Sequence, residues 1–210
     1  VKLVITNYPE GKSETFKVEN NPTDPAAGTH EITFSRECWI EADDFMAEPI
    51  PKYKRLFPDG PECRLKGAYL IKCVGYETDE NGNVIEVAAE YDPNSRGGDP
   101  ADGRKVKGAT IHWVDAATSI DAEIRVYSEL FSDPAPDGAD KDFLACMNPD
   151  SLEVLTGCKV EARMRDVAAA YDKSEKKGKT APNFQFMRLG YFCLDNKDCS
   201  ADHLVFNRSV

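Results

Sequence analysis

Apolar and polar residues alternate with a period of two in short segments along most of the chain, and this pattern limits the fold more than any other feature. Successive side chains of a β-strand point to opposite faces of a sheet, so the alternation predicts strands buried on one face. Clusters of Pro, Gly, Asn and Asp separate the segments, as is typical of turns. The predicted strands are residues 1–7, 13–19, 30–35, 37–41, 64–77, 83–91, 110–114, 122–127, 151–164, 184–195 and 204–208.

The pair Asn81-Gly82 is the sharpest turn signal in the chain. It lies between two alternating segments and predicts a tight β-hairpin, because both residues tolerate the backbone that such a turn requires. Helical patterns are scarce by comparison. The predicted helical turns are residues 42–48, 140–147 and 166–172.

So many short strands at close spacing predict an all-β fold, in which the sheets either close into barrels or stack as a sandwich. Two polar segments without periodicity, residues 132–142 and 173–181, predict loops or linkers. They flank or lie within a unit that would run from about residue 118 to residue 180. No internal repeat of fixed length is present.

The charge of the chain restricts its partners. There are 26 Lys and Arg residues against 37 Asp and Glu, which gives a formal net charge of −11 and disfavours nucleic acid as a partner. Local charge, however, decides whether an anion binds, so a polyanion stays possible where positive charges cluster. Such clusters occur at residues 52–55, 64–66, 104–107 and 173–179.

The sequence lacks the motifs of phosphate loops, serine nucleophiles and zinc proteases. Its three histidines, His30, His112 and His203, are far apart. His112 alternates with Ile111 and Trp113 in a predicted strand, where a histidine is more often structural than catalytic. We therefore expect no catalytic residue in this chain.

The cysteines are expected to be free and mostly buried thiols, because none are spaced as CxxC and no signal peptide is visible. We accordingly expect no metal site. No apolar segment reaches the length of a membrane span, which predicts a soluble, cytoplasmic protein. The seven cysteines are Cys38, Cys63, Cys73, Cys146, Cys158, Cys193 and Cys199.

Residues 184–192 interleave Gln185 and Arg188 with aromatic side chains. Arginine and glutamine hydrogen-bond to base edges while aromatic rings stack on unpaired bases, and recognition of single-stranded RNA requires this combination. The same aromatic residues would also suit the core of a barrel. The pattern leaves both explanations open.

Several segments resemble, in the same order and over essentially the whole chain, the carboxy-terminal anticodon-binding region of bacterial-type glutaminyl-tRNA synthetases. They are VKLVITNYPEG, KYKRL, RLKGAYLIK, DPADGRKVKG, IHWV, AEIRVYSELF, NPDSL, FQFMRLGYFCLD and VFNRSV. The resemblance implies two antiparallel β-barrels of the L25-like kind with few short helices, the distal barrel being inserted into the proximal one. The proximal barrel would comprise residues 1–117 and 181–210, and the distal barrel residues 118–180.

The resemblance also implies which side chains contact the anticodon. Lys52 stands where a member of the family has glutamine, so contacts to a base and to a phosphate are both open. The segment 57–62 is one residue longer than in the family. The implied anticodon-binding residues are Lys52, Lys54, Arg55, Arg64, Gln185 and Arg188.

For the cluster at 104–107, the resemblance implies that Arg104, Lys105 and Lys107 hold either backbone phosphates or neighbouring carboxylates. His112 and Trp113 would belong to the core or lie near it. No catalytic role is expected for His112.

The parent protein implied by the resemblance is a class I aminoacyl-tRNA synthetase that joins glutamine to its tRNA with ATP and Mg²⁺. Its catalytic domain would lie upstream in the same chain, so this region would bind the anticodon stem-loop of tRNA(Gln), as a monomer and without a cofactor of its own. Two alternatives stay open: the carboxy-terminal region of a glutamyl-tRNA synthetase, and a ribosomal RNA-binding barrel of the L25 kind.

Overall fold

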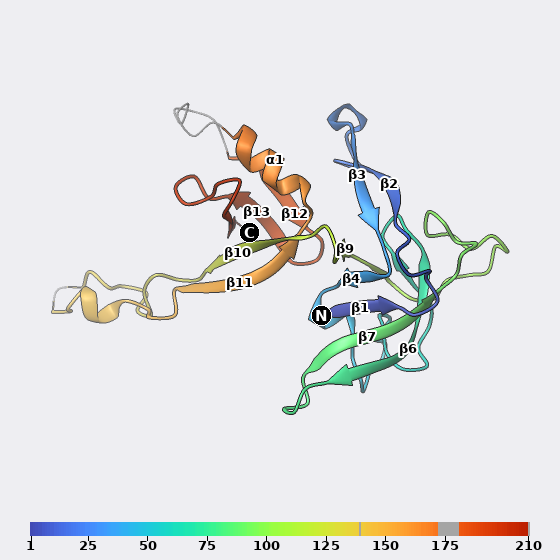
Figure 1. The fold of residues 1–210 in the computed structure, drawn as a ribbon. Helices are drawn as coiled ribbons and strands as arrows, with labels where there is room; N and C mark the ends of the chain where they lie inside the picture. Colours follow the sequence, from blue (N-terminus) through green and yellow to red (C-terminus); the bar gives the residue numbers. More distant parts are fainter. Residues whose placement is uncertain (139, 172–180, 210) are drawn as a thin grey trace. The chain divides into compact units, whose positions relative to one another are not determined.

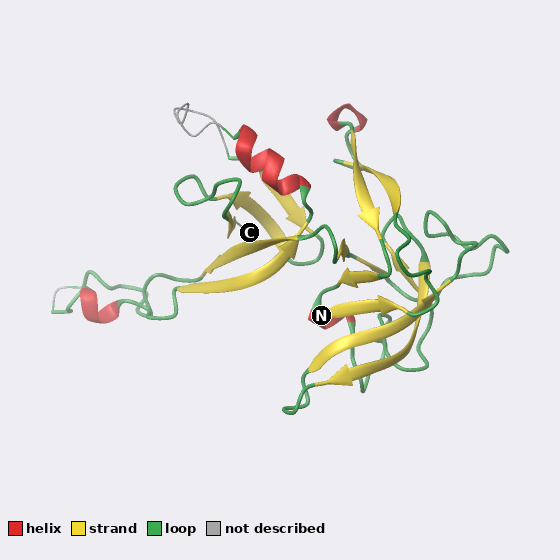
Figure 2. Cartoon of the chain, in the orientation of Figure 1, coloured by secondary structure: helices red, strands yellow, loops and turns green. Residues whose placement is uncertain are grey.

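A computed structural model of the protein describes residues 1–138, 140–171 and 181–209 (Figure 1). The chain forms two compact units, Val1–Ser119 and Ile120–Val210. Strands dominate both units (Figure 2). The single α-helix of the described residues is α1 (Arg163–Ala170). The predicted all-β fold class is therefore confirmed. No helix in the described part has the length and apolar character needed to cross a membrane.

The first unit is built on a seven-stranded sheet in the order β8-β5-β6-β7-β1-β4-β9. Its strands are β1 (Lys2–Ile5), β4 (Glu37–Trp39), β5 (Cys63–Leu65), β6 (Leu70–Thr78), β7 (Val84–Tyr91), β8 (Thr110–Ile111) and β9 (Val114–Asp115). Figure 1 shows β1 beside β7, with which it pairs in parallel.

This sheet has to curl, because its two edge strands are consecutive in the chain. A flat sheet of seven strands would separate the edges by about 29 Å at the usual spacing. The residues from Ile111 to Val114 span at most about 11 Å. The corner between β8 and β9 therefore brings the two edges of the sheet toward each other, as the predicted barrel requires.

The hairpin of β2 (Glu14–Glu19) and β3 (Thr29–Phe34) adds aromatic side chains to the core of the first unit. Phe34 is fully buried and its ring packs edge-on against Tyr8, Phe16 and Trp113. Edge-to-face contacts of this kind stabilise aromatic pairs beyond the area they bury. The hairpin is thus tied to the main sheet through its rings.

The predicted hairpin at Asn81-Gly82 is confirmed. It joins β6 to β7, and Gly82 has a φ of 84°, which glycine adopts without steric cost. Asp79 stabilises the turn because its carboxylate accepts hydrogen bonds from the backbone N–H groups of Asn81 and Asn83.

The second unit is a five-stranded sheet in the order β11-β10-β14-β13-β12. Its core contains Phe192, Leu194, Leu204, Val205 and Phe206, and α1 packs against β14. The strands are β10 (Ile120–Tyr127), β11 (Leu152–Val160), β12 (Asn183–Phe186), β13 (Gly190–Leu194) and β14 (Leu204–Arg208).

The strand pairing differs from the expected division of the chain. We expected residues 181–210 to return to the unit formed by residues 1–117, but β14 pairs in parallel with β10, and β12 and β13 follow on the same sheet. The described residues of 181–210 therefore belong with residues 120–160, and the second unit is not an insertion. Alternation in the sequence fixes which face of a strand is buried but does not fix which strand it pairs with.

Two further details differ from the expected pattern. Among the described strands, the pairs β1–β7, β5–β8 and β10–β14 are parallel, although antiparallel sheets were expected. The helical turns predicted at 42–48 and 140–147 are 3₁₀ turns, η2 (Ala42–Asp44) and η3 (Leu144–Cys146), and a third turn is η1 (Pro25–Ala27). The helix predicted at 166–172 is α1, which begins three residues earlier; residues 172–180 lie outside the described residues.

Gly108 provides a test of the packing in the first unit. A Cβ atom at this position would lie 2.1 Å from the Glu62 carbonyl oxygen and 2.8 Å from Cys63 Sγ, so an alanine forces the backbone of the two segments apart. We expect Gly108→Ala to lower the free energy of unfolding by about 3 kcal/mol, in the range of overpacked cores. Urea unfolding followed by tryptophan fluorescence measures this, because Trp39 and Trp113 both lie in the first unit.

Gly75→Ala is the matched control. Its added Cβ would meet Ala88 Cβ at 3.9 Å, an ordinary van der Waals contact on a strand. If both alanine variants unfold at the same urea concentration, close packing at Gly108 does not stabilise the fold.

Glu14 provides a pH-dependent test. Burial alone would raise the pKa of Glu14, but hydrogen bonds from the hydroxyls of Tyr8 and Tyr69, both 2.8 Å, and an ion pair with Arg96 at 3.1 Å outweigh it and lower the pKa. A lowered pKa stabilises the fold above the pKa of the unfolded chain, and this stabilisation is lost as the pH falls through the folded-state pKa. We expect Glu14→Gln to lower the free energy of unfolding by about 2 kcal/mol at neutral pH.

The difference between wild type and Glu14→Gln should shrink as the pH falls below the usual glutamate range. Urea unfolding at a series of pH values measures this, with Glu10→Gln as the control because the Glu10 side chain is 86% exposed. A difference that stays constant down to acid pH would mean that the charge of Glu14 does not stabilise the fold.

Candidate functional site

Four of the predicted anticodon-binding residues lie in the first unit on segments that are side by side. The N–H of Ala109 donates to the carbonyl of Lys54 at 2.7 Å, and the N–H of Arg64 donates to the carbonyl of Ala109 at 3.0 Å. The backbone at Ala109 therefore joins the segment 52–55 to β5. Residues that are about ten positions apart in the sequence become neighbours.

Arg55 is held by contacts to a neighbouring turn. Its Nη1 donates to the carbonyl of Asp43 at 2.7 Å, and its Nε lies 3.5 Å from Oδ1 of Asp44. The guanidinium also lies over the ring of Tyr53, 5.6 Å from the centroid, which is the geometry of a cation–π contact. The side chain remains 32% exposed, so Arg55 is both oriented and accessible.

Arg64 is held in a similar way by a different loop. Its Nε donates to the carbonyl of Gly98 at 2.9 Å, and its Nη2 lies 3.4 Å from Oδ1 of Asp99. Arg64 is half-buried, at 30% side-chain exposure, whereas Asp99 is 89% exposed. The loop after β7 thus orients a second arginine near the segment 52–55.

Lys52 and Lys54 are exposed and lie next to Arg55 in the chain. Lys52 has a φ of 71°, in the left-handed region that a residue with a side chain adopts at a cost of about 1–2 kcal/mol. Two exposed ammonium groups in this position add positive charge to the surface beside both arginines.

The other two predicted residues lie in the second unit, on the hairpin of β12 and β13. Gln185 pairs with Tyr191 across the two strands, so both side chains lie on the same face, and both are exposed. Arg188 lies in the turn between the strands and is also exposed, with a φ of 68°. Like Lys52, it occupies a strained backbone position.

The aromatic segment 184–192 could serve either the core or the stacking of unpaired bases, and each explanation fits different residues. The ring of Phe186 stacks on Phe192 at 4.3 Å, and Phe184 packs against Phe206, so these phenylalanines belong to the core. The side chain of Tyr191, in contrast, is 52% exposed. Alternation along the strand separates a core face from a polar face that carries Gln185 and Tyr191.

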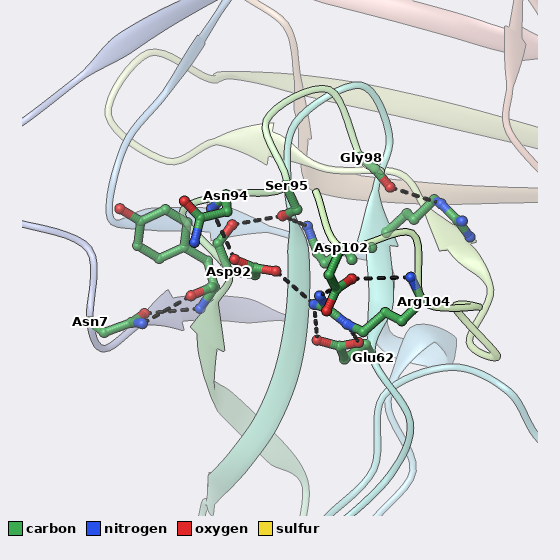
Figure 3. A network of polar contacts seen from close by, with 11 residues as sticks. Asn7, Glu62, Asp92, Asn94, Ser95, Gly98, Asp102 and Arg104 are labelled. Atoms are coloured by element: carbon green, nitrogen blue, oxygen red, sulfur yellow. Dashed lines mark hydrogen bonds and ion pairs between the residues drawn. The ribbon is translucent and has the colours of Figure 1, made fainter. Parts of the chain in front are cut away.

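Arg104 binds neighbouring carboxylates, one of the two roles that the resemblance implied. Figure 3 shows its guanidinium between three acidic side chains. Nε and Nη2 donate to the two oxygens of Glu62 at 2.9 and 2.8 Å, Nη2 also donates to Asp92 at 2.6 Å, and Nη1 donates to Asp102 at 3.0 Å. The hydrogen bond from Arg104 lowers the pKa of the Asp92 carboxyl. Arg104 is therefore a structural residue, while Lys105 and Lys107 are exposed.

His112 is half-buried and directly precedes the core residue Trp113. Trp113 is buried, its indole N–H donates to the carbonyl of Lys66 at 3.1 Å, and its ring packs on Phe34. These contacts fit the core position expected for Trp113.

All seven cysteines are free, as predicted. Burial raises the pKa of the Cys63 thiol to about 12 and also raises that of Cys38, so both stay protonated at neutral pH. Within the described residues, no group of three or more His, Cys, Asp and Glu side chains could hold a metal ion.

Contacts around the arginines add residues that the sequence did not indicate. Asp43, Asp44 and Gly98 hold Arg55 and Arg64, although acidic and glycine residues in turns gave no reason to select them. The Tyr53 hydroxyl donates to the Asp43 carbonyl at 2.7 Å, and burial raises the pKa of Tyr53 to about 12. Tyr191 could have been selected, because it alternates with Phe192 and so had to face the opposite side of β13.

Comparison with known proteins identifies the family. Two family profiles, both described as the anti-codon binding domain of tRNA synthetases class I (E and Q), match residues 1–92 and 110–195. The first range contains Lys52, Lys54, Arg55 and Arg64, and the second contains Gln185 and Arg188.

The alignments with similar proteins cover the whole of this chain. The glutamine–tRNA ligase of Clostridium kluyveri is 52% identical over 211 residues, covering 100% of this chain and 35% of the relative. The enzymes of that name from Aliivibrio fischeri and Bordetella avium are 50% and 48% identical, with 100% of this chain and 35% and 33% of the relatives covered. The chain spans about a third of the length of these curated relatives. It belongs to the anticodon-binding domains of the class I tRNA synthetases for glutamate and glutamine.

Proposed function

We propose that the chain is the anticodon-binding region of a glutamine–tRNA ligase and that it binds the anticodon loop of tRNA(Gln). The observation that carries the proposal is the similarity of the entire chain to glutamine–tRNA ligases. The family profiles include the glutamate enzymes as well, but the relatives named here are glutamine enzymes, which favours glutamine over glutamate.

In the first unit, Arg55 and Arg64 are the proposed base readers. A guanidinium has five N–H donors in a fixed plane, and a base edge accepts two of them at once. Both arginines are already oriented by main-chain carbonyls in the free protein, so binding would order few side-chain rotamers.

In the second unit, Gln185 and Arg188 are the proposed readers. The amide of Gln185 offers a donor and an acceptor to the Watson–Crick edge of an unpaired base. Tyr191, opposite Gln185 on the exposed face, provides a ring on which such a base stacks.

Lys52 and Lys54 are proposed to bind phosphates. The net charge of −11 repels RNA at long range, so affinity has to come from short-range contacts made by a few cations. The exposed ammonium groups beside Arg55 fit this role because an ammonium is a compact charge without the planar fork that reads a base.

The activity of the longer protein belongs to the same proposal. It would charge tRNA(Gln) with glutamine in the cytoplasm, as a monomer, using ATP and Mg²⁺ in a catalytic domain upstream. We assign no residue of this chain to ATP or Mg²⁺, and its contribution is to select the tRNA.

The first binding prediction concerns base discrimination in the second unit. We expect the chain to bind an RNA hairpin with a CUG or UUG anticodon more tightly than one with the middle U replaced. Gln185→Ala and Arg188→Ala should each reduce this preference by about 1–3 kcal/mol, because each loses hydrogen bonds to one base. Fluorescence anisotropy titrations with the hairpins measure the preference.

Arg165→Ala is the control for this experiment, because Arg165 is an exposed arginine of the same unit on α1. If Gln185→Ala and Arg188→Ala weaken both hairpins equally, these residues do not read bases. Tighter binding of a tRNA(Glu) hairpin or of ribosomal RNA would favour the glutamate enzyme or the ribosomal barrel.

The second binding prediction concerns phosphate contacts. We expect Lys52→Ala and Lys54→Ala each to reduce the slope of log affinity against log salt by about 0.7, the value for one phosphate of a single strand. Both variants should weaken all hairpins alike and leave base preference unchanged. Lys17→Ala, at an exposed position on β2, is the control; an unchanged slope in the Lys52 and Lys54 variants would contradict the assignment.

A further inference from the structure

Arg55 and Arg64 are held by the same two kinds of group. Each donates to one main-chain carbonyl, that of Asp43 at 2.7 Å or that of Gly98 at 2.9 Å. Each also lies beside one carboxylate, Asp44 at 3.5 Å or Asp99 at 3.4 Å. The two arginines therefore form a natural comparison in which the carbonyl and carboxylate contacts match in kind and distance, while Arg55 also lies over the ring of Tyr53.

The two carboxylates differ in burial. The side chain of Asp44 is 0% exposed, whereas that of Asp99 is 89% exposed. Water solvates Asp99 whether or not Arg64 is nearby, and exposed ion pairs of this kind contribute only about 0–1 kcal/mol. Asp44 is shielded from water, so solvent weakens its attraction to the Arg55 guanidinium far less than it weakens the Asp99–Arg64 pair. Movement of Arg55 away from Asp44 therefore costs more than movement of Arg64 away from Asp99.

The backbone around Asp44 is itself fixed to the segment that carries Arg55. The carbonyl of Asp44 accepts a hydrogen bond from the N–H of Leu56 at 3.0 Å, and the N–H of Met46 donates to the carbonyl of Leu56 at 3.0 Å. Phe45, which lies between Asp44 and Met46 in the chain, forms a parallel bridge with Leu56 and is buried. The carboxylate and the arginine are thus attached to one rigid piece of the first unit.

We propose that Asp44 is a positioning residue for anticodon recognition, and that it fixes the guanidinium of Arg55 in the orientation that reads a base. The proposal rests on the proposed function of the chain. With Nη1 donating to the Asp43 carbonyl and Nε beside the Asp44 carboxylate, two of the three guanidinium nitrogens of Arg55 are held by this turn. Asp44 itself does not touch the RNA; it restricts the directions in which the remaining donors of Arg55 point.

The test uses the full 210-residue chain, a hairpin with a CUG anticodon and three hairpins that each have one anticodon base changed. Preference is the ratio of dissociation constants between a changed hairpin and the CUG hairpin. Arg55→Ala first identifies the anticodon position at which Arg55 acts. Asp44→Asn, Asp99→Asn and the double variant Asp44→Asn with Arg55→Ala are then compared at that position.

We expect Asp44→Asn to reduce the preference at that position about tenfold and to leave the other two positions unchanged. Asp99→Asn, the same chemical change beside Arg64, should alter every preference by less than about twofold. In the double variant, Asp44→Asn should add nothing to the effect of Arg55→Ala, because residues that act through one another are not additive. A structural role of Asp44 would instead lower affinity for all hairpins and remain additive.

The outcomes separate this inference from the function on which it rests. A wild-type chain that does not distinguish the hairpins overturns both. If Arg55→Ala reduces the preference but Asp44→Asn does not, or if their effects add, only the role of Asp44 is overturned.

A measurement on the wild-type chain decides the question if Asp44→Asn does not fold. The ¹⁵N relaxation of Arg55 Nε reports whether the side chain is fixed before RNA binds. We expect an order parameter close to that of rigid backbone, about 0.85. A value below about 0.6, typical of flexible groups, overturns the proposal.

Discussion

The backbone of residues 108–111 lies beside the segment 52–55 and β5 and hydrogen-bonds to both. Ala109 accepts a hydrogen bond from Arg64 on one side and donates one to Lys54 on the other, and Gly108 approaches the carbonyl of Glu62 so closely that no side chain fits. Because Thr110–Ile111 is also β8, an edge strand of the seven-stranded sheet, the same residues complete the sheet and assemble the basic surface of the first unit. The curled sheet and the basic surface of the first unit therefore depend on the same residues.

Several acidic residues of the first unit hold arginine side chains in place. Glu62, Asp92 and Asp102 bind Arg104, and Asp44 lies beside Arg55, so part of the negative charge orders the positive charge instead of opposing it. The loop that begins at Asp92 also carries Gly98, whose carbonyl holds Arg64. Arg104, whose donors are satisfied by carboxylates, thus supports the loop that orients the half-buried Arg64.

Much of this organisation follows from the sequence. Period-two alternation predicted the strands, Asn81-Gly82 predicted the β6–β7 hairpin, and the face of Gln185 could be derived from its neighbours. The pairing of β14 with β10 could not be predicted in this way. Any alternating strand can pair with any sheet edge, and the choice depends on side-chain packing over the whole unit. The role of Asp44 could not be predicted either, because the sequence does not distinguish an exposed turn aspartate from a buried aspartate that lies beside an arginine.

Among the described residues other than glycine, those with left-handed backbone are Lys52, Asp59 and Arg188, and two of these three are proposed to contact RNA. Glycine would occupy positions 52 and 188 with less strain, so the folding free energy alone disfavours the residues that are present. The chain accepts a less stable turn in order to project a cation from the tip of that turn. Maximal stability and maximal recognition therefore require different amino acids at these two positions, and the residues that are present favour recognition.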